Sequence, residues 1–545
     1  MTLQDPAALM SNGERAWGLA AARGDLTTPA AVDFVANIRW SPSLGADPEL
    51  AAAMAEGDRR NPSRVPDQSS GPPWRVDVNE DPATAVALST LIASAVNDPL
   101  PAEPKTELGY ARRFIHVYGA RLRYVPPWRQ WLVWDGTRWA HDIDGQAQRW
   151  MKTIARRITT DALAIADPDR RKAALREAKR GESSAGVAGA LTLASTEPEV
   201  AIVPDALDVD PFLLNCANGT LDLRTGELHA HDPGQLLTKV TAAAYRPDHP
   251  GTVFPGFLER IQPDPDMRRF LARLLGHALE GRQAVHLLPI FHGDGANGKS
   301  TLVNAVDAAL GDYAAPADPD LLFARSFDAH PTSNADLFGL RLAVLHEGDA
   351  GRRLAEGTVK RLTGGDAIKA RRMREDFWSF TPSHTFVMLT NHRPLVSGSD
   401  EGIWRRLRLV PFQVVIPLAE RDDDLAAKLG LEADAILAWL VTGYLDWRTH
   451  GLDEPAPVAA ATAAYKAESD ALGRFLDERC LLGPHHRARS SDLYNTWTRW
   501  CTTEGEEPGT NKAFTTQLQN RGFDTQRTKV GAVFVGVGIA TESEG

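Results

Sequence analysis

The stretch FHGDGANGKST, residues 291–301, has the residue types and the spacing of a loop that binds phosphate. It fits the pattern G-x-x-x-x-G-K-S/T, in which glycines let backbone N–H groups wrap an anion. Lys299 is the candidate lysine for the terminal phosphates, and the Ser300 hydroxyl is the candidate Mg²⁺ ligand. We expect nucleotide contacts from Gly293, Asp294, Gly295, Ala296, Asn297, Gly298, Lys299, Ser300 and Thr301.

The sequence on either side of this loop agrees with that interpretation. An apolar run, LLPIF, precedes the loop and predicts a buried strand, and KSTLVNAVDAAL follows it with the spacing of a helix. The N-terminus of such a helix adds the positive end of its dipole to an anion site. The alternative is a glycine-rich turn with a solvated lysine, which leaves both flanking elements unexplained.

A nucleotide hydrolase also needs an acid at the end of a neighbouring strand, to hold magnesium and to polarise the attacking water. The segment RLAVLHEGDAG contains a short apolar strand from Leu342 to Leu345, and Glu347 follows its end. Glu347 is therefore the predicted catalytic acid and second metal ligand. Asp349 is the weaker candidate, and an acid after an apolar strand is also common in ordinary loops.

A third apolar strand, HTFVMLTNHRP, ends in Thr390 and Asn391. If this strand lies beside the strand that precedes the loop, the Asn391 side chain can touch the terminal phosphate or the attacking water. The alternative is a plain turn, because Asn-His-Arg-Pro favours turns by its own chemistry.

Two arginines precede a further apolar strand in the segment SDEGIWRRLRLVPF. An arginine that reaches a nucleotide across a subunit boundary accelerates phosphoryl transfer by roughly 10³ to 10⁵ fold. Arg405 and Arg406 are candidates for this role, which makes sense only in an oligomer. The alternative is that both are ordinary surface arginines. The sequence does not show which of Arg405 and Arg406 would be the finger.

A basic cluster lies in TVKRLTGGDAIKARRMREDFW, where cationic residues outnumber acids and Gly364-Gly365-Asp366 can form a turn. Such a cluster neutralises strand phosphates without reading base sequence. A solvated basic face is the alternative. The candidate DNA contacts in this segment are Lys360, Lys369, Arg371, Arg372 and Arg374.

The last part of the chain reads as two helices followed by a hairpin. DLYNTWTRWCTTEG and NKAFTTQLQNRGF have helical spacing, and a hairpin is expected around Gly531. This order fits a winged helix, whose second helix enters a DNA groove. Lys512 and Arg521 are the predicted contacts, although such modules also dock on proteins.

Length and composition limit the remaining possibilities. A chain of 545 residues is too long for one hydrophobic core, and its net charge of −11 argues against a protein coated in basic surface. No apolar run is long enough to span a membrane, no secretion signal is visible, and three distant cysteines favour a reducing cytoplasm. The predicted divisions are residues 1–104 (leader and linker), 105–250, 251–450, 451–468 (linker) and 469–545.

Taken together, GDGANGKST, LAVLHEGD, TVKRLTGGDAIKARRM, MLTNHRP and DEGIWRRLRLVPF resemble, in this order, the superfamily 3 helicase domain of phage and plasmid primase-helicases. That group includes poxvirus and satellite-phage replication proteins. Upstream, ELGYARRFIHVYGARLRYVPPWRQWLVWDGTRW and LLNCANGTLDLRTGELHAHDP look like the domain that precedes the motor in that family. The resemblance covers about 440 residues, from near Leu108 onward.

The resemblance implies an α/β fold with an AAA+-type P-loop NTPase core, an α+β N-terminal domain and a C-terminal winged-helix-like domain. It implies an ATP- and Mg²⁺-dependent DNA helicase, a hexameric homo-oligomer that moves on single-stranded and forked DNA in the cytoplasm of a bacterial host. By position, Lys299 and Ser300 match the family's loop, Glu347 its acid, Asn391 its polar sensor and Arg405 or Arg406 its finger.

One departure from the family limits the expected activity. Residues 1–100 are too short and irregular for a polymerase-type primase domain, so no primer synthesis is expected of this chain, and a separate primase or polymerase becomes a possible partner. A second hypothesis is an ATP-switched protein that binds an origin and assembles there without unwinding. Strand displacement on forked DNA separates the two hypotheses.

Overall fold

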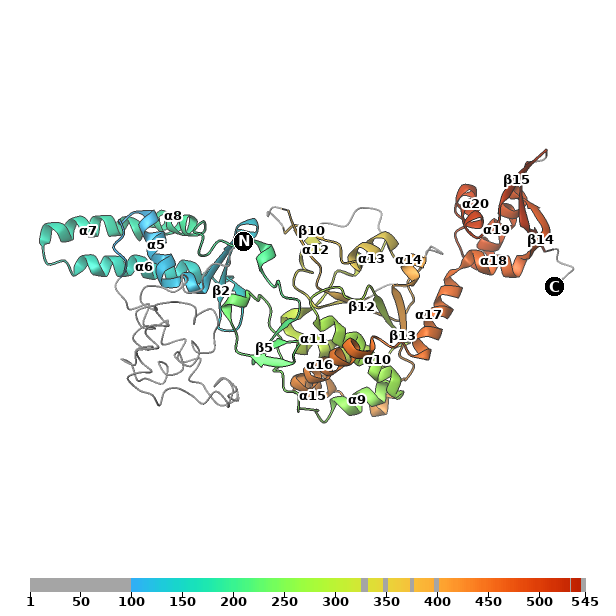
Figure 1. Cartoon of the computed structure of the whole chain (residues 1–545), viewed down its shortest axis with the longest axis horizontal. Helices are drawn as coiled ribbons and strands as arrows, with labels where there is room; N and C mark the ends of the chain where they lie inside the picture. The colour runs from blue at the N-terminus through green and yellow to red at the C-terminus, as the bar shows by residue number, and fades with distance from the viewer. Residues whose placement is uncertain are drawn as a thin grey trace, which may run out of the picture. The chain divides into compact units, whose positions relative to one another are not determined.

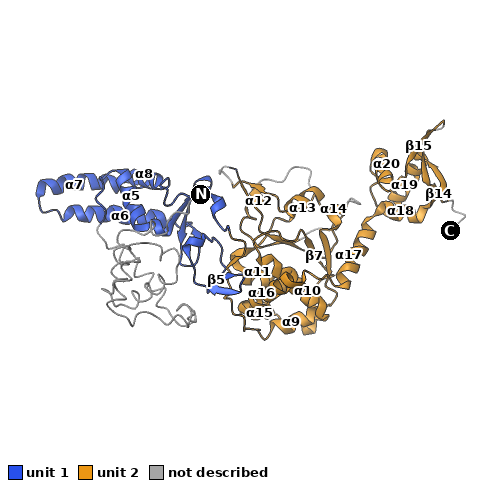
Figure 2. Cartoon of the chain, in the orientation of Figure 1, with its two compact units in different colours: residues 1–209, 215–240, 374–377 blue, residues 210–214, 241–373, 378–545 orange. Residues whose placement is uncertain are grey.

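The computed structural model describes residues 100–324, 332–346, 351–372, 377–396, 401–529 and 531–540. The chain divides into two compact units (Figure 2). Unit 1 comprises residues 1–209, 215–240 and 374–377, and unit 2 comprises residues 210–214, 241–373 and 378–545. The change of unit after residue 240 lies close to the domain boundary that the sequence predicts at residue 250.

Unit 1 contains a helical bundle among its described residues. Its helices are α5 (Glu107–Tyr118), α6 (Gln146–Leu163), α7 (Pro168–Gly181) and α8 (Ser184–Ala194) (Figure 1). Side-chain caps set where the helices start, because Thr106 accepts from the Gly109 N–H and Asp167 accepts from the Arg170 N–H. The buried side chains that the helices share include Tyr110, Phe114, Met151, Ile154, Ile158 and Ala178.

Two small sheets accompany this bundle. The first is antiparallel and runs in the order β1 (Leu122–Val125), β2 (Gln130–Trp134) and β3 (Trp139–His141). At the turn between β2 and β3, the Asp135 carboxylate accepts from the backbone N–H groups of Thr137 and Arg138. The second sheet has the order β4 (Leu213–Cys216), β5 (Gly219–Asp222) and β6 (Glu227–His229).

A five-stranded parallel sheet is the centre of unit 2. Its order is β13 (Leu407–Pro411), β7 (Leu288–His292), β12 (Thr385–Thr390), β9 (Leu342–His346) and β8 (Ala314–Pro316). The central strands are buried almost along their whole length, as expected of parallel strands covered on both faces. Because all five strands run in the same direction, their carboxyl ends lie at one edge.

Helices pack closely around this sheet. They include α9 (Phe254–Ile261), α10 (Pro265–Gly276), α11 (Lys299–Leu310), α15 (Leu425–Gly430) and α16 (Ala433–His450) (Figure 1). Helices α10 and α16 approach so closely that a Cβ on Gly276 would lie 2.5 Å from the Leu440 carbonyl oxygen. A Cβ on Gly443 would lie 2.1 Å from the Ala272 carbonyl oxygen. Two glycines therefore fix this backbone contact.

Short elements complete the core of unit 2. They are α12 (Thr332–Ala335), α13 (Glu356–Leu362), β10 (Ile368–Ala370), β11 (Trp378–Phe380) and α14 (Glu401–Trp404). Strands β10 and β11 pair with each other antiparallel, so part of the basic segment identified in the sequence lies on a two-stranded ribbon. Trp378 and Phe380 on this ribbon pack edge-on against Phe338.

The C-terminal part of unit 2 joins three helices to a three-stranded antiparallel sheet. Its elements are α18 (Ala471–Arg479), β14 (Cys480–Arg489), α19 (Ser490–Glu504), α20 (Asn511–Asn520), β15 (Thr525–Thr528) and β16 (Gly531–Ile539). The two predicted helices and the predicted hairpin at Gly531 are confirmed, since Thr528 pairs with Gly531. Among the described helices, none is long and apolar enough to cross a membrane.

The predicted linker, residues 451–468, differs from expectation because most of it is helix α17 (Ala456–Ser469). Its alanines favour a helix, and the helix gains a place to pack because Val458 and Tyr465 are buried. Thr462 also accepts a hydrogen bond from the Leu409 N–H of β13 at 3.0 Å. The chain therefore leaves the core along an ordered helix.

His384, just before β12, is completely buried, and neither ring nitrogen has a hydrogen-bond partner among the described residues. Burial lowers the pKa of His384 to about 3. Below about pH 6.5 His384 therefore binds a proton in the unfolded chain but stays neutral in the folded chain. The free energy of unfolding consequently falls as the pH drops from about 6.5.

We expect His384→Leu to raise the free energy of unfolding by roughly 1–3 kcal/mol, because it removes a buried polar group that lacks a partner. Urea unfolding at pH 7.5 and at pH 5.5 measures this change. The gain should be larger at pH 5.5. A variant less stable than the parent at both pH values would contradict the expectation.

Candidate functional site

The glycine-rich loop connects β7 to α11, as the sequence predicts. Gly295, Ala296 and Gly298 have positive φ values of 93°, 50° and 79°, so the backbone turns sharply three times before the helix begins. A Cβ on Gly298 would lie 2.3 Å from Cγ2 of Ile261, a residue of α9. Gly298 is therefore required both by its conformation and by the close approach of α9.

The chain after β13 holds the loop from the side. The Asn297 side chain is 2% exposed, and its amide donates to the Phe412 carbonyl at 3.1 Å. The Ile416 N–H donates to the Ala296 carbonyl at 2.8 Å. A Cβ on Gly293 would lie 2.3 Å from both the Asn297 amide nitrogen and the Phe412 oxygen. These contacts fix the loop in one conformation.

Lys299 is the first residue of α11, and its side chain folds back over the loop. Its ammonium donates to the Gly293 carbonyl at 3.0 Å and to the Asn391 side-chain oxygen at 2.6 Å. Burial lowers the pKa of Lys299, and the nearby Asp294 carboxylate acts against that shift. A third neutral acceptor is the Asn297 side-chain oxygen at 3.5 Å, and phosphate oxygens can replace these acceptors.

The contact with Asn391 comes from the order of the strands. Strand β12 lies directly beside β7, and Thr390 is level with His292. Asn391, the next residue, therefore leaves the sheet edge next to the loop. The Thr390 hydroxyl donates to the His392 carbonyl and accepts from the His392 N–H at 2.9 Å, which closes a tight turn. The condition that the sequence set for Asn391, a strand beside the loop strand, is met.

The predicted acid lies outside the described residues, as do Asp349 and Arg374. The strand that leads to Glu347 is described, and β9 ends at His346. His346 is level with Leu389 on the other side of β12. The carboxyl end of β9 therefore lies at the same sheet edge as the loop and Asn391.

One residue at this edge was not singled out from the sequence. His292 ends β7 immediately before the loop, and burial lowers its pKa, with a further contribution from Arg393. Its imidazole is therefore neutral near pH 7. The only signal in the sequence is its position as the last strand residue before the loop.

The two candidate arginines have different surroundings. Arg406 is 7% exposed, its Nε donates to the Thr363 hydroxyl at 3.2 Å, and one terminal nitrogen donates to the Gly402 carbonyl at 2.8 Å. Arg405 is exposed. Arg406 therefore has the environment of a residue that holds α13 and α14 together, and Arg405 is the one whose side chain faces solvent.

The basic segment places its cations on and beside the β10–β11 ribbon. Lys369 is exposed on β10 opposite Ser379, and Arg371 and Arg372 follow the strand and are partly buried. Lys360 lies in the last turn of α13. The described cations therefore come from two neighbouring segments of unit 2.

In the C-terminal part, the two predicted contacts differ. Lys512 is exposed at the start of α20. Arg521 forms an ion pair with Asp470, whose carboxylate also accepts from the Gly473 N–H and caps α18. Arg521 is therefore already engaged within the chain.

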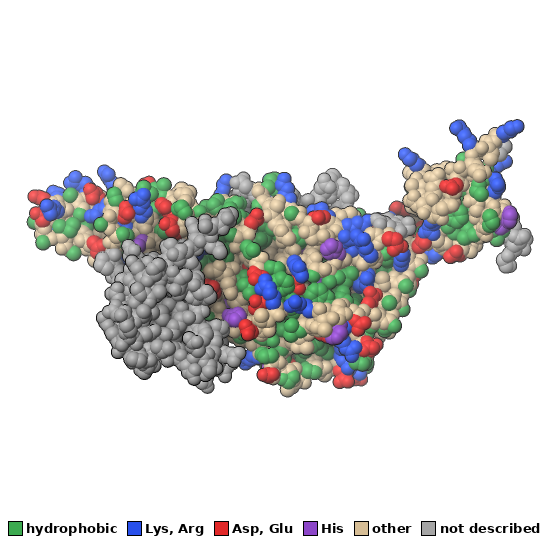
Figure 3. Space-filling view, in the orientation of Figure 1, with side chains coloured by type: hydrophobic (Ala, Val, Ile, Leu, Met, Phe, Trp, Pro, Cys, Tyr) green, Lys and Arg blue, Asp and Glu red, His purple; other side chains and the backbone are tan. Residues whose placement is uncertain are grey.

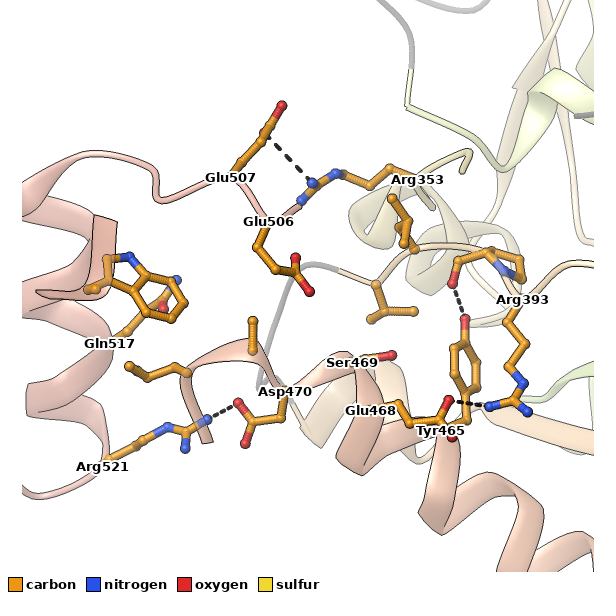
Figure 4. A pocket seen from close by; sticks show the side chains of 16 residues that line it. Arg353, Arg393, Tyr465, Glu468, Ser469, Asp470, Glu506, Glu507, Gln517 and Arg521 are labelled. Carbon is orange, nitrogen blue, oxygen red and sulfur yellow. Dashed lines mark hydrogen bonds and ion pairs between the residues drawn. The ribbon is translucent and has the colours of Figure 1, made fainter. Parts of the chain in front are cut away.

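A polar cavity of about 290 Å³ is lined in part by Arg393, Tyr465 and Glu468 (Figure 4). Arg393, two residues after Asn391, forms an ion pair with Glu468 of α17, and the Tyr465 hydroxyl donates to the Pro394 carbonyl. The segment that follows Asn391 is thus attached to α17, which leads to the C-terminal part.

Glu432 positions the loop indirectly, from the far end of α9. Its carboxylate accepts from the Thr252, Val253 and Phe254 N–H groups, which begin that helix, and from the Thr252 hydroxyl. Burial raises the pKa of Glu432, but these hydrogen bonds outweigh burial and lower it to about 2. Ile261, at the other end of α9, packs against Gly298. The hydrogen bonds that hold the start of α9 therefore also help to position the loop.

We expect Glu432→Gln to lower the free energy of unfolding by about 3 kcal/mol at pH 7, the size that this pKa shift implies. The stabilisation should be complete above about pH 4.5 and disappear as the pH falls toward 2. Thermal unfolding across this pH range measures it. Glu259→Gln, on the exposed face of α9, is the matched control, and equal losses from both variants would contradict the assignment.

Two family models match the chain. Residues 111–263 match the family described as D5 N terminal like, and residues 291–406 match a family of unknown function. The second match begins in β7 and ends just before β13, so it contains the loop, Lys299 and Asn391.

Similar proteins come from large DNA viruses. "Putative helicase L207/L206" of Acanthamoeba polyphaga mimivirus is 28% identical over 319 residues, which are 54% of this chain and 33% of that protein. "Putative helicase 022R" of Frog virus 3 is 26% identical over a match that covers 46% of this chain and 28% of the viral protein. "Putative primase C962R" of African swine fever virus is 24% identical over a match that covers 54% of this chain and 34% of the viral protein. The chain therefore spans about a third of the length of these relatives.

Among solved structures, the chain is similar to the apo C-terminal region of NrS-1, at 11% identity and a TM-score of 0.44. The match covers 80% of this chain and all of that one. The family descriptions and the names of the viral relatives confirm the resemblance that the sequence predicts.

Proposed function

We propose, from the resemblance of this chain to D5-like primase-helicases of the superfamily 3 type, that it is an ATP-dependent DNA helicase of replication. The observation that carries the proposal is the 2.6 Å contact between the Lys299 ammonium and the Asn391 side chain. Two motifs that are 92 residues apart in sequence meet over one loop, as a shared triphosphate site requires.

Each residue of the site then has a role in ATP hydrolysis. The N–H groups of the loop and the start of α11 would bind the phosphates, and Lys299 would stabilise the charge on the terminal phosphate. Asn391 would orient that phosphate or the attacking water. Lys299 and Asn391 already touch, so little movement is needed to place both on one phosphate.

The residues around the loop also fit Mg²⁺, which prefers hydroxyl and carboxylate oxygens and keeps several waters. The Ser300 side chain is exposed at the start of α11, and the end of β9 brings the chain toward the same edge just before Glu347. Ser300 and Glu347 would hold the ion, which would neutralise charge on the terminal phosphates. Glu347 would also accept the proton of the attacking water.

We assign the finger to Arg405. An arginine that acts on a neighbouring subunit's nucleotide has to be exposed, and Arg405 meets this condition while Arg406 is buried against Thr363 and Gly402. The proposal includes a hexameric ring, in which each triphosphate site is completed by the next protomer. The parallel sheet with its loop at the carboxyl edge supports the expected AAA+-type core.

DNA contacts are proposed for the β10–β11 ribbon and for the C-terminal part. The exposed Lys369 and the neighbouring Lys360, Arg371, Arg372 and Arg374 would follow strand phosphates without reading bases. The succession of helices and hairpin in the C-terminal part supports a winged-helix-like module. There Lys512 is available for DNA, whereas Arg521 would first have to leave Asp470.

A forked DNA substrate tests the function. The chain is expected to displace the labelled strand with ATP and Mg²⁺, and not with either one alone. ATP-dependent binding of duplex DNA without displacement would contradict the helicase proposal. That result would favour the second hypothesis, an ATP-switched protein that assembles on an origin.

A further inference from the structure

Helices α6 and α7 of unit 1 carry an excess of positive charge that the ATP site does not use. Residues 146–181 contain ten Lys or Arg and four Asp or Glu, in a chain whose net charge is −11. Figure 3 shows Lys and Arg side chains, with Asp and Glu among them, on the part of unit 1 that contains α5 to α8. The sign of this region is therefore opposite to that of the whole chain.

Packing explains why the charges face solvent. On α7 the buried residues are Ala174, Ala178 and Gly181, which lie on one side of the helix and face the bundle. A Cβ on Gly181 would lie 2.1 Å from the Tyr110 ring, so this side approaches α5 closely. The small inner face leaves the long cationic side chains on the outside. The exposed ones are Arg149, which pairs with Asp144, and Lys152, Arg156, Arg170, Lys172, Arg176, Lys179 and Arg180.

Like-charge pairs recur at helical spacing along α6 and α7. Lys152 and Arg156 are four residues apart, as are Lys172 and Arg176, and Arg176 and Arg180. Each like-charge pair at this spacing costs a few tenths of a kcal/mol. Within the described part of the chain, these five residues form no ion pair with an acid. Only Lys179 and Arg180 gain from the dipole at the end of α7.

We propose that the outer face of α6 and α7, called here the basic face, binds the phosphodiester backbone of nucleic acid. Lys172, Arg176 and Arg180 extend about 12 Å along α7, at 1.5 Å per residue. This length matches roughly three to four phosphates on one strand of a duplex. Exposed cations without acidic partners fit such a polyanion, and the contact is independent of base sequence.

This surface is an addition to the proposed motor. The ribbon cations belong to the 241–373 stretch of unit 2, whereas the basic face belongs to unit 1. Its loss would therefore weaken DNA binding while leaving the triphosphate site chemically intact. DNA binding by the basic face and ATP hydrolysis at the triphosphate site can thus be tested independently in the full chain.

The test is a salt titration of DNA binding by the full chain, with Arg176→Gln, Lys179→Gln and Arg180→Gln combined. Fluorescence anisotropy with a labelled 30-base single strand and with the matched duplex gives the slope of log K against log salt. The matched control neutralises three exposed cations of unit 2 by Arg246→Gln, Arg269→Gln and Lys428→Gln.

For the basic-face variant we expect the slope on duplex to become less steep by about 2–3, and by about 2 on a single strand. The control should keep the slope of the parent chain. Because Arg176→Lys with Arg180→Lys preserves the charge, that variant should bind normally. A change confined to one substrate would assign the surface to single-stranded or to duplex DNA. Unchanged slopes on both substrates, with circular dichroism showing a folded variant, would overturn the proposal.

Discussion

Replacing Lys299 with alanine is expected to lower the rate of ATP hydrolysis by at least about 100-fold. The ammonium is buried at the loop and held by the Gly293 carbonyl and the Asn391 side chain, so no other described side chain occupies its place. Without it, charge that develops on the terminal phosphate loses its nearest cation. A phosphate-release assay at saturating ATP and Mg²⁺ measures the loss.

The same substitution removes the donor to the Gly293 carbonyl and to the Asn391 side chain, so stability has to be measured alongside activity. Lys299→Met keeps the length of the side chain and supplies a second inactive variant if the alanine variant unfolds. Lys428→Ala, an exposed lysine of α15, is the control and should hydrolyse ATP at the parent rate. Near-normal turnover by a folded Lys299 variant would contradict the assignment of the loop.

Neutralising the β10–β11 ribbon is expected to separate hydrolysis from strand displacement. With Lys369→Gln, Arg371→Gln and Arg372→Gln combined, unwinding of forked DNA should fall at least about tenfold, because several phosphate contacts are lost at once. ATP hydrolysis without DNA should remain within about twofold, since Lys369 lies on the ribbon and not at the loop. Parallel displacement and phosphate-release assays measure both.

The matched control for the ribbon is the triple Gln variant of Arg246, Arg269 and Lys428, which changes the net charge by the same amount elsewhere in unit 2. It should unwind DNA normally. If the ribbon variant displaces strands as fast as the control, the ribbon cations do not bind the DNA strand during unwinding. If it also loses hydrolysis without DNA, the substitutions have disturbed the core.

The loop and its neighbours could be predicted because their signals are local. Positive φ at Gly295 and Gly298 needs glycine, and the apolar run before the loop and the periodic run after it correspond to β7 and α11. The place of Asn391 followed from a general property of parallel sheets, whose carboxyl ends share an edge. Pairing of β12 with β7 supplied the remaining condition.

Other features depend on contacts between distant segments, which no local pattern contains. Glu432 caps α9 from about 180 residues away, and its sequence context reads as an ordinary exposed acid. Arg405 and Arg406 are adjacent and chemically identical, and only packing against Thr363 distinguishes them. The segment around α17 was predicted to be a linker because it is rich in proline and alanine. That composition gives no sign that Val458 and Tyr465 are buried.

The central claim is that one triphosphate lies between Lys299 and Asn391, and a structure of the chain with Mg²⁺ and a non-hydrolysable ATP analogue tests it most directly. We predict terminal phosphate oxygens within about 3 Å of the Lys299 ammonium and of the Asn391 side chain, with both side chains turned toward phosphate and no longer toward each other. An analogue bound elsewhere, with the 2.6 Å contact between the two side chains unchanged, would contradict the account.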